Sequence, residues 1–471
     1  MVVFRPWNDF IRNPVRPAGL KIALHRERWM NVDLLIYNGT ILTVNSKFDI
    51  IENGFICVKN GKLERIESCG QKEVFPEATE VIDAKGCIVM PGLVNAHTHL
   101  PMTLFRGLAD DQPLTVWLDH IFPAESNHIH SESVRYGTLL ACAEMILSGT
   151  TTCCDGYFLE DEVAGAVIDS GMRAVLGQGI IDFPAPGVPN PSDNVKTAEK
   201  FIRKWQDMTP TVTPSVFCHS PYTCSADTLK KAKKAADSKG VLFQIHVAET
   251  RNEWDQTRLE HRTTPVRHLD RLGILDENTL LVHTIWVDSE DIEVIARREA
   301  RICVTTESEM KLASGIAPVP DFLRSGITVG LGTDGCASNN NLDLFQEMDL
   351  TAKLHKVCTL DPTVMGARAV LEMATIGGAK AIGLDKEIGS LEPGKQADMI
   401  IIDMNKPHLV PMYDPVSHLV YTVRGSDIRD VVISGRMILK DRKILTLDLS
   451  DILESVSEIA ECIKKTNRRF I

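Results

Sequence analysis

Short apolar runs alternate with helical patterns through the middle of this chain, and this alternation constrains its fold more than any other feature. Amphipathic patterns such as Ser133–Leu147 and Ala226–Ala236 separate most of the runs. Eight strand-then-helix units predict an α/β fold, a (β/α)₈ TIM barrel in which a parallel sheet closes inside a ring of helices. A doubly wound open sheet is the structural alternative, but it does not require eight units. The runs lie at residues 87–97, 150–155, 173–181, 212–219, 241–247, 279–284, 301–305 and 327–333.

The two ends of the chain carry β patterns of the same kind. Residues 31–88 contain short apolar segments separated by turns, and residues 392–445 return to this pattern, with Gly435-Arg436 placed like a hairpin turn. Two such regions, with a long α/β stretch between them, predict one small β-sandwich formed from the N- and C-terminal segments. The barrel would then occupy residues 89–391, and residues 446–471 would form a C-terminal helical segment.

Residues 1–29 differ from the rest of the chain. They contain six basic and two acidic residues, and they lack the continuous apolar core of a secretory signal. Met30 shortly precedes the first β pattern. We interpret residues 1–29 as an extension outside the native fold, with Met30 as the candidate start of the native chain; a transit peptide is the alternative.

The charge and cysteine content exclude several classes of partner. With 63 acidic against 51 basic residues the formal net charge is −12, and no basic block is present, so we expect neither nucleic acid nor a membrane surface as a partner. No apolar run approaches the roughly 18 residues that span a bilayer. Twelve cysteines without a Cys-x-x-Cys pair are typical of reduced thiols in an intracellular protein, so we expect a cytoplasmic location.

Histidine and acidic residues stand at the ends of several apolar runs. His97 and His99 are two residues apart at the end of the first run, so they project to the same side of a strand. His246, His283 and Asp334 end the fifth, sixth and eighth runs. Because the carboxyl ends of all strands in such a barrel meet at one mouth, we expect these five side chains to converge there. Singly, each is also compatible with a buried core histidine or a helix-capping aspartate.

A metal site would explain this convergence. Three imidazoles and one carboxylate suit one divalent metal ion, with Zn²⁺ the leading expectation and Fe²⁺ the alternative. A catalytic ion keeps one position open for water, whose pKa falls from about 15.7 toward 7. Glu249, three residues after His246, is placed to carry a proton between that water and a substrate.

Longer motifs resemble a known family, the amidohydrolase superfamily, over about residues 33–440. The motifs that carry this resemblance are His97-Thr98-His99, His246-Val247-Ala248-Glu249, His283 and Leu331-Gly332-Thr333-Asp334. Three further stretches are similar to its branch of 5-methylthioadenosine/S-adenosylhomocysteine deaminases: residues 101–111, 311–319 and 389–398.

The resemblance implies a role for each site residue. The metal ligands would be His97, His99, His246 and Asp334. A single ion is implied because the fourth run, residues 211–219, has no lysine for a bridging carbamate. Asp334 would also accept a proton from the attacking water, and His283 would orient the hydroxide and the tetrahedral intermediate. Glu249 would protonate the ring nitrogen and then help ammonia to leave.

The implied reaction is hydrolytic deamination of an adenine nucleoside to the inosine-type product and ammonia. Glu125 matches a carboxylate that holds both ribose hydroxyls, His219 a histidine of the substrate pocket, and Ser338 a residue near the metal and the ring. For these three positions the alternative is ordinary loop packing. The resemblance also implies a homo-oligomer and a small-molecule substrate as the partner.

Two positions depart from the family pattern. Gln178 stands where members that bind S-adenosylhomocysteine carry an arginine for its carboxylate. We therefore predict that Gln178 lies at the substrate and that neutral 5′ groups are preferred, as in methylthioadenosine, 5′-deoxyadenosine or adenosine. Glu309 stands where the branch has an asparagine. We interpret Glu309 as a loop carboxylate paired with Lys311 or with solvent; the alternative is an acid at the pocket mouth that selects a different ring.

Two other functions stay open on the sequence alone. An aminohydrolase or chlorohydrolase of another amino-heterocycle, guanine-, pterin- or triazine-like, would use the same barrel, although a ribose-holding Glu125 would not serve a free base. A non-catalytic scaffold of this fold would need a broken metal site, whereas all four ligands and Glu249 are present.

Overall fold

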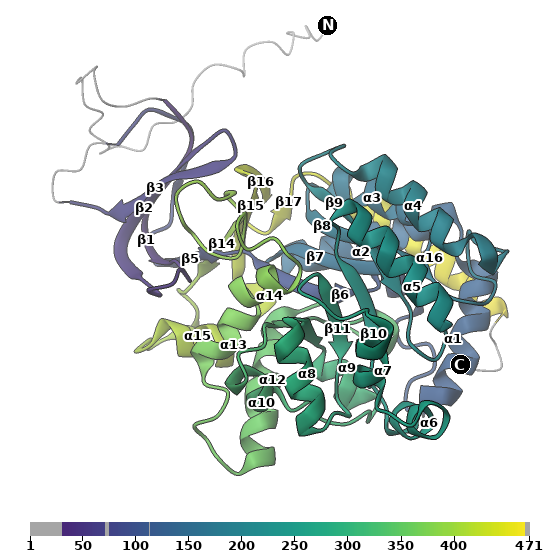
Figure 1. The fold of residues 1–471 in the computed structure, drawn as a ribbon. Coiled ribbons are helices and arrows are strands. Elements are labelled where there is room, and N and C mark those ends of the chain that lie inside the picture. The colour runs from purple at the N-terminus through teal and green to yellow at the C-terminus, as the bar shows by residue number, and fades with distance from the viewer. Residues whose placement is uncertain (1–30, 71–74, 113, 467–471) are drawn as a thin grey trace, which may run out of the picture.

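The structure is a computed structural model that describes residues 31–70, 75–112 and 114–466. The predictions for residues 1–29 and Met30 lie outside the described residues. Figure 1 shows two sheets side by side, one of them surrounded by helices and the other built from strands of both chain ends. In this described part, no helix is long and apolar enough to cross a membrane.

The first sheet has eight parallel strands in chain order, from β6 (Leu93–Thr98) to β13 (Val329–Leu331). Its edges meet, because Thr98 and Asp334 form a parallel bridge and the Asp334 N–H donates to the His97 carbonyl at 3.0 Å. The sheet therefore closes on itself, which confirms the predicted (β/α)₈ TIM barrel. The strands between these two are β7 (Thr150–Tyr157), β8 (Arg173–Ile180), β9 (Val212–Cys218), β10 (Phe243–Val247), β11 (Thr279–His283) and β12 (Arg301–Val304).

Helices cover the outside of the barrel, and their ends carry the residues that helix termini favour. In α7 (Pro265–Leu272), the Thr264 side chain accepts the Arg267 N–H, proline occupies the first position, and Gly273 ends the helix at φ 76°. The other helices of this region are η1 (Leu100–Phe105), α1 (Leu114–His128), α2 (Ser131–Leu147), α3 (Glu160–Ser170), η2 (Pro191–Asp193), α4 (Asn194–Trp205), α5 (Ala226–Lys239), α6 (Arg251–His261), α8 (Ser289–Arg298), α9 (Thr306–Lys311), α10 (Val319–Arg324), α11 (Cys336–Asn339), α12 (Leu344–Thr359), α13 (Ala367–Met373) and α14 (Ile376–Ala381).

The second sheet is mixed and contains nine strands from both ends of the chain. At its centre β5 (Cys87–Pro91) runs parallel to β1 (Val32–Leu42) and antiparallel to β14 (Met399–Asp403). The sheet curls, because Leu63 and Val432 belong to one core although their strands lie far apart in the strand order. The remaining strands are β2 (Ile50–Lys59), β3 (Lys62–Ser68), β4 (Ala78–Asp83), β15 (Ile428–Ile433), β16 (Arg436–Lys440) and β17 (Lys443–Ile444).

The apolar run at residues 87–97, predicted as one barrel strand, is in fact two strands in two different sheets. The first ends at Pro91 in the mixed sheet, and the second begins at Leu93 in the barrel. Between them Gly92 lies against Thr151, where a Cβ on residue 92 would come within 2.1 Å of the Thr151 Oγ1. The apolar pattern hides this break because both strands are fully buried.

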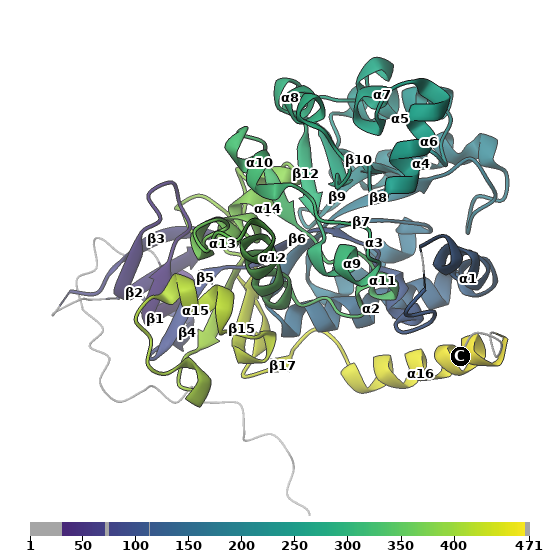
Figure 2. The same cartoon turned by 90° about the horizontal axis from the view of Figure 1, so that it is seen from below.

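The C-terminal helix α16 (Leu449–Thr466) lies within the predicted helical segment 446–471. It runs along the outside of the barrel next to α2, as Figure 2 shows. Ile452 packs there with Leu139 and Ala166, which anchors the helix to the barrel layer. The remaining helices, which lie between β14 and β15, are η3 (Pro407–Leu409), α15 (Pro415–Tyr421) and η4 (Gly425–Asp427).

Candidate metal centre and active site

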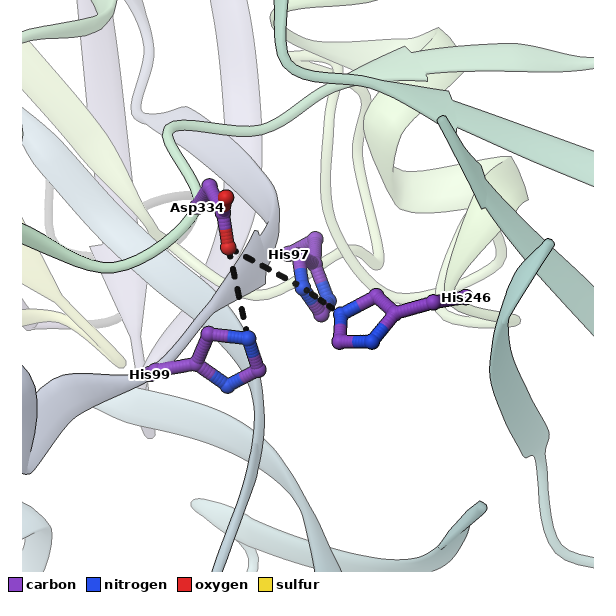
Figure 3. A group of neighbouring side chains, drawn as sticks. All are labelled: His97, His99, His246 and Asp334. Atoms are coloured by element: carbon purple, nitrogen blue, oxygen red, sulfur yellow. Dashed lines mark hydrogen bonds and ion pairs between the residues drawn. The ribbon is translucent and has the colours of Figure 1, made fainter. Parts of the chain in front are cut away.

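Four side chains converge at the carboxyl ends of the barrel strands, as Figure 3 shows. They are His97 in β6, His99 directly after it, His246 in β10 and Asp334 beyond β13. One possible ligand atom of each lies within 4.8 Å of those of the others. The Nε2 atoms of His97 and His246 are 3.0 Å apart. The structure thus brings together the four predicted metal ligands.

The spacing and chemistry of these atoms fit a single divalent ion. Bonds of about 2.0–2.2 Å in a tetrahedral arrangement separate ligand atoms by roughly 3.4 Å. Asp334 Oδ1 lies 3.3 Å from His99 Nε2 and 3.6 Å from His97 Nε2. Burial lowers the pKa of His97 to about 4 and holds the pKa of His246 well below its usual range. Both rings therefore keep the lone pair that a metal ion needs.

Hydrogen bonds behind the ligands orient them toward the site. His99 Nδ1 lies 2.7 Å from the Gly156 carbonyl and donates to it, which leaves the Nε2 lone pair facing the other ligands. The hydroxyls of Ser308 and Ser338 donate to Asp334 Oδ2 at 2.7 and 2.8 Å, which leaves Oδ1 facing the histidines. The sequence places Ser338 near the metal but does not single out Ser308, whose only signal is its position shortly after β12.

His283 and Glu249, predicted as catalytic residues, face the same site. His283 ends β11, and its Nε2 lies 3.9 Å from Glu249 Oε2 in the loop after β10. Burial raises the pKa of Glu249, so this carboxyl holds a proton more readily than an exposed glutamate. Burial alone would lower the pKa of His283, but the carboxylates of Glu249, Glu309 and Asp334 raise it to about 9.

The loop that carries Glu249 is held by a glutamate that the sequence analysis missed. The buried Glu253 carboxylate accepts the backbone N–H groups of Ala248 and Glu249, each at 2.9 Å. Ala248 has φ 52°, in the left-handed region that residues other than glycine rarely adopt. The signal that could have found Glu253 is its place in the first turn of α6, directly after the His246-to-Glu249 motif.

A cavity of about 930 Å³, its open mouth included, leads away from the metal ligands. Glu125 of α1 lies in its wall and accepts a hydrogen bond from the Tyr157 hydroxyl, and burial raises the pKa of Glu125 to about 7. His219 and Ser338 also line the cavity, and the His219 ring lies 5.3 Å from the His246 ring. Three of the four predicted substrate contacts therefore face one space.

The rest of the cavity wall is largely apolar. Among the described residues that line it, none is a lysine or an arginine. The apolar and aromatic lining residues include Trp117, Leu118, Ile121, Phe122, Phe158, Ile181, Phe183, Pro184 and Pro186. A charged group would find no cation in this wall.

Gln178, the fourth predicted substrate contact, does not reach this cavity, so that prediction is wrong. Its neighbour Gly177 faces the barrel interior, next to Gln244 and Ser215. Since side chains alternate along a strand, Gln178 faces outward and lines a separate cavity. There its Oε1 accepts the Glu160 N–H at 3.4 Å.

The interpretation of Glu309 is also corrected. Lys311 Nζ lies 2.6 Å from both Asp110 Oδ1 and Asn340 Oδ1, so it does not pair with Glu309. Glu309 itself is only 4% exposed and does not line the active-site cavity. It lies behind His283, with its Oε1 3.6 Å from His283 Nδ1. Neither solvent nor the substrate ring is therefore its partner.

Comparison with known proteins agrees with this site. The chain matches the model of the amidohydrolase family over residues 88–438. It is 46% identical over 433 residues to a 5-methylthioadenosine/S-adenosylhomocysteine deaminase of Syntrophobacter fumaroxidans, covering 92% of this chain and 98% of that one. It is 44% identical over 431 residues to a 5′-deoxyadenosine deaminase of Methanosarcina mazei, covering 91% and 98%. A solved adenosine deaminase from Xanthomonas campestris with bound zinc has a TM-score of 0.90 at 34% identity, covering 93% and 100%.

A (β/α)₈ barrel with three histidines and an aspartate at its carboxyl end defines the class of metal-dependent hydrolases. Within that class, the chain belongs to the amidohydrolase family. This confirms the resemblance found in the sequence motifs, and the intact ligand set and buried Glu249 argue against a non-catalytic scaffold.

Proposed function

We propose that this chain is a metal-dependent deaminase that converts an adenine nucleoside to the inosine-type product and ammonia. The observation that carries the proposal is one cavity lined both by three of the four metal ligands and by the buried Glu125. A ring amino group suits the metal end, and a ribose diol suits a carboxylate acceptor. The names of the relatives in Syntrophobacter, Methanosarcina and Xanthomonas support the same substrate class.

The side chains around the site divide the work of this reaction. A bound divalent ion would act as a Lewis acid and would lower the pKa of the attacking water. Glu249 would protonate the ring nitrogen beside the carbon that carries the amino group, which makes that carbon more electrophilic. Asp334 would accept the proton that the water loses, and His283 would hold the attacking oxygen by a hydrogen bond. A C–O bond forms, the C–N bond breaks, and ammonia leaves with a proton.

The cavity wall favours a neutral 5′ group. Without a lysine or arginine among the described lining residues, the carboxylate of S-adenosylhomocysteine would lose its hydration and gain no cation. A methylthio group or a 5′-deoxy carbon would instead contact aromatic side chains such as Phe122 and Phe183. Gln178 lies outside this cavity, so the preference for a neutral 5′ group rests on the cavity wall and not on Gln178.

Ammonia release from a panel of amino-heterocycles tests the proposal. The panel is methylthioadenosine, 5′-deoxyadenosine, adenosine, S-adenosylhomocysteine, guanine and a pterin, each with the zinc-loaded enzyme. We expect kcat/KM for the best neutral nucleoside to exceed that for S-adenosylhomocysteine by roughly 10- to 100-fold, the cost of one unpaired buried charge. Highest efficiency with guanine or the pterin would establish the alternative substrate class, and highest efficiency with S-adenosylhomocysteine would refute the 5′ preference.

We also infer the identity of the metal, the assembly and the location. Three imidazoles and one carboxylate suit zinc, the ion in the Xanthomonas relative. A homo-oligomer stays a proposal that sedimentation would test. Ten of the twelve cysteines are buried or half-buried, which is compatible with a reducing compartment such as the cytoplasm.

A further inference from the structure

Glu309 is a buried carboxylate that has no role in the proposed reaction as described above. It lies on α9, and among the described residues its only ion-pair partner is His283. A buried carboxylate is costly unless hydrogen bonds satisfy it. Two groups of Thr305 do so: the N–H donates to Glu309 Oε1 at 3.0 Å, and the hydroxyl lies 3.4 Å from the same oxygen.

The Thr305 hydroxyl also contacts His283, on the side of the ring that faces away from the cavity. Thr305 Oγ1 lies 3.0 Å from His283 Nδ1. A hydroxyl has one proton to donate, and a carboxylate can only accept. If the Thr305 proton points to Glu309, the Thr305 oxygen must accept, and His283 must donate its Nδ1–H. In this hydrogen-bond chain, His283 donates to Thr305 and Thr305 donates to Glu309.

We infer that Glu309, acting through Thr305, is a positioning residue that holds the Nδ1–H of His283 and directs Nε2 to the substrate. The inference rests on the proposed function, in which His283 Nε2 holds the attacking oxygen. The orientation of the ring agrees with this role, because Nδ1 faces Thr305 and Nε2 faces Glu249. Without an acceptor behind it, the Thr305 hydroxyl could turn and donate to Nδ1, which requires that Nδ1 carry no proton.

A purely structural role for Glu309 makes a different prediction. Its carboxylate also braces the start of α9 by accepting the Thr305 N–H. In Glu309→Gln the amide oxygen can still accept that N–H, so the brace and the side-chain volume are kept. The negative charge that lies 3.6 Å from His283 Nδ1 is lost, however, so the hold on the Nδ1 proton is weakened. This variant therefore separates the two roles.

The experiment compares Glu309→Gln, Thr305→Val and Thr305→Ser with wild-type enzyme loaded with zinc. Steady-state ammonia release from the best nucleoside gives kcat and KM, and zinc content and Tm are measured on the same samples. We expect kcat to fall roughly 10- to 100-fold in Glu309→Gln and Thr305→Val, the range seen for residues that orient metal-binding histidines through a hydrogen bond. KM should change less than about twofold. Thr305→Ser keeps the hydroxyl and should retain most of the kcat.

The double variant and a matched control sharpen the test. Because Glu309 and Thr305 act in series, the double variant should be no worse than either single one. Glu307→Gln changes a glutamate of the same helix whose carboxylate accepts from Gln346 and does not face His283, so it should keep the wild-type kcat. Wild-type kcat in Glu309→Gln, or a loss of kcat that follows a loss of zinc or a lower Tm, would overturn the inference.

The protonation of the ring supplies a readout that does not need turnover. In ¹⁵N-histidine spectra, His283 of the wild type should show a protonated Nδ1. Glu309→Gln should raise the fraction of rings with an unprotonated Nδ1, and an unchanged spectrum would contradict the inference. If no nucleoside is deaminated, the proposed function fails while this spectrum still decides the hydrogen-bond chain.

Discussion

Arg173 and Asp398 form a buried ion pair that joins the barrel to the mixed sheet. Arg173 Nε lies 2.8 Å from Asp398 Oδ2, and both side chains are 2% exposed. The same guanidinium donates to the Pro210 carbonyl and the Ser434 hydroxyl, each at 2.7 Å. The Ser434 N–H in turn donates to Asp398 Oδ1. The pair is thus well hydrogen-bonded, and it links β8 to the turn between β15 and β16.

Removal of one partner should destabilise the fold strongly. In Arg173→Met the Asp398 carboxylate stays buried without its cation, which costs about 3–5 kcal/mol. The exposed pair of Arg135 and Asp169, at 42% and 50% exposure, gives a matched control, and Arg135→Met should cost less than about 1 kcal/mol. Urea unfolding followed by circular dichroism measures both; equal midpoints would show that the buried pair does not join the two sheets energetically.

Chelation should abolish ammonia release, and added Zn²⁺ should restore it. The four ligand atoms are close enough to share one ion, so metal analysis should find one ion per chain. His246→Ala should lose both the ion and the activity, because a neutral imidazole is removed from the ligand set. Full turnover after exhaustive dialysis against a chelator would rule out the metal-dependent mechanism.

Ser308→Ala should weaken metal binding although Ser308 is not itself a ligand. Its hydroxyl donates to Asp334 Oδ2 at 2.7 Å and so holds Oδ1 toward the histidines. Loss of such a contact typically lowers metal affinity 10- to 100-fold, or by ~1–3 kcal/mol. Competition with a fluorescent zinc chelator measures this affinity. The exposed Ser457 of α16 serves as the control, and Ser457→Ala should bind zinc as the wild type does.

Glu125→Ala should raise KM for a nucleoside far more than for a free base such as adenine. Hydrogen bonds between a carboxylate and two ribose hydroxyls are worth about 1.5–3 kcal/mol each, so the KM of the nucleoside should rise at least roughly tenfold. Adenine has no ribose and should lose little. Equal increases in the two KM values would favour a free-base substrate.

The same carboxyl predicts a pH dependence of KM. Burial raises the pKa of Glu125 to about 7, so it is a carboxylate above that pH and a neutral acid below it. Protonation removes acceptors for the ribose, and KM for the nucleoside should therefore rise as the pH falls through about 7. Glu125→Gln cannot titrate, and its KM should be flat over this range. A wild-type KM that is equally flat would mean that Glu125 does not hold the ribose.

The metal site was predictable because its signal is local. Each of His97, His246 and Asp334 stands at the end of an apolar run, and in a parallel barrel all strand ends of one polarity meet on one side. The number of runs indicated the barrel for the same reason. Such patterns depend only on residues that are close in sequence, so one amino-acid sequence contains all the information that they need.

The tertiary structure alone decided which way buried polar side chains face and which partners they take. Gln178 lies on a strand covered on both sides, so its apolar neighbours could not tell the cavity face from the helix face. Glu309 and Lys311 are two positions apart on α9, and side chains at this spacing do not face each other on a helix. Packing therefore directs Lys311 to Asp110 and Glu309 to His283, because long-range contacts, which no local pattern encodes, settle the partners of a buried charge.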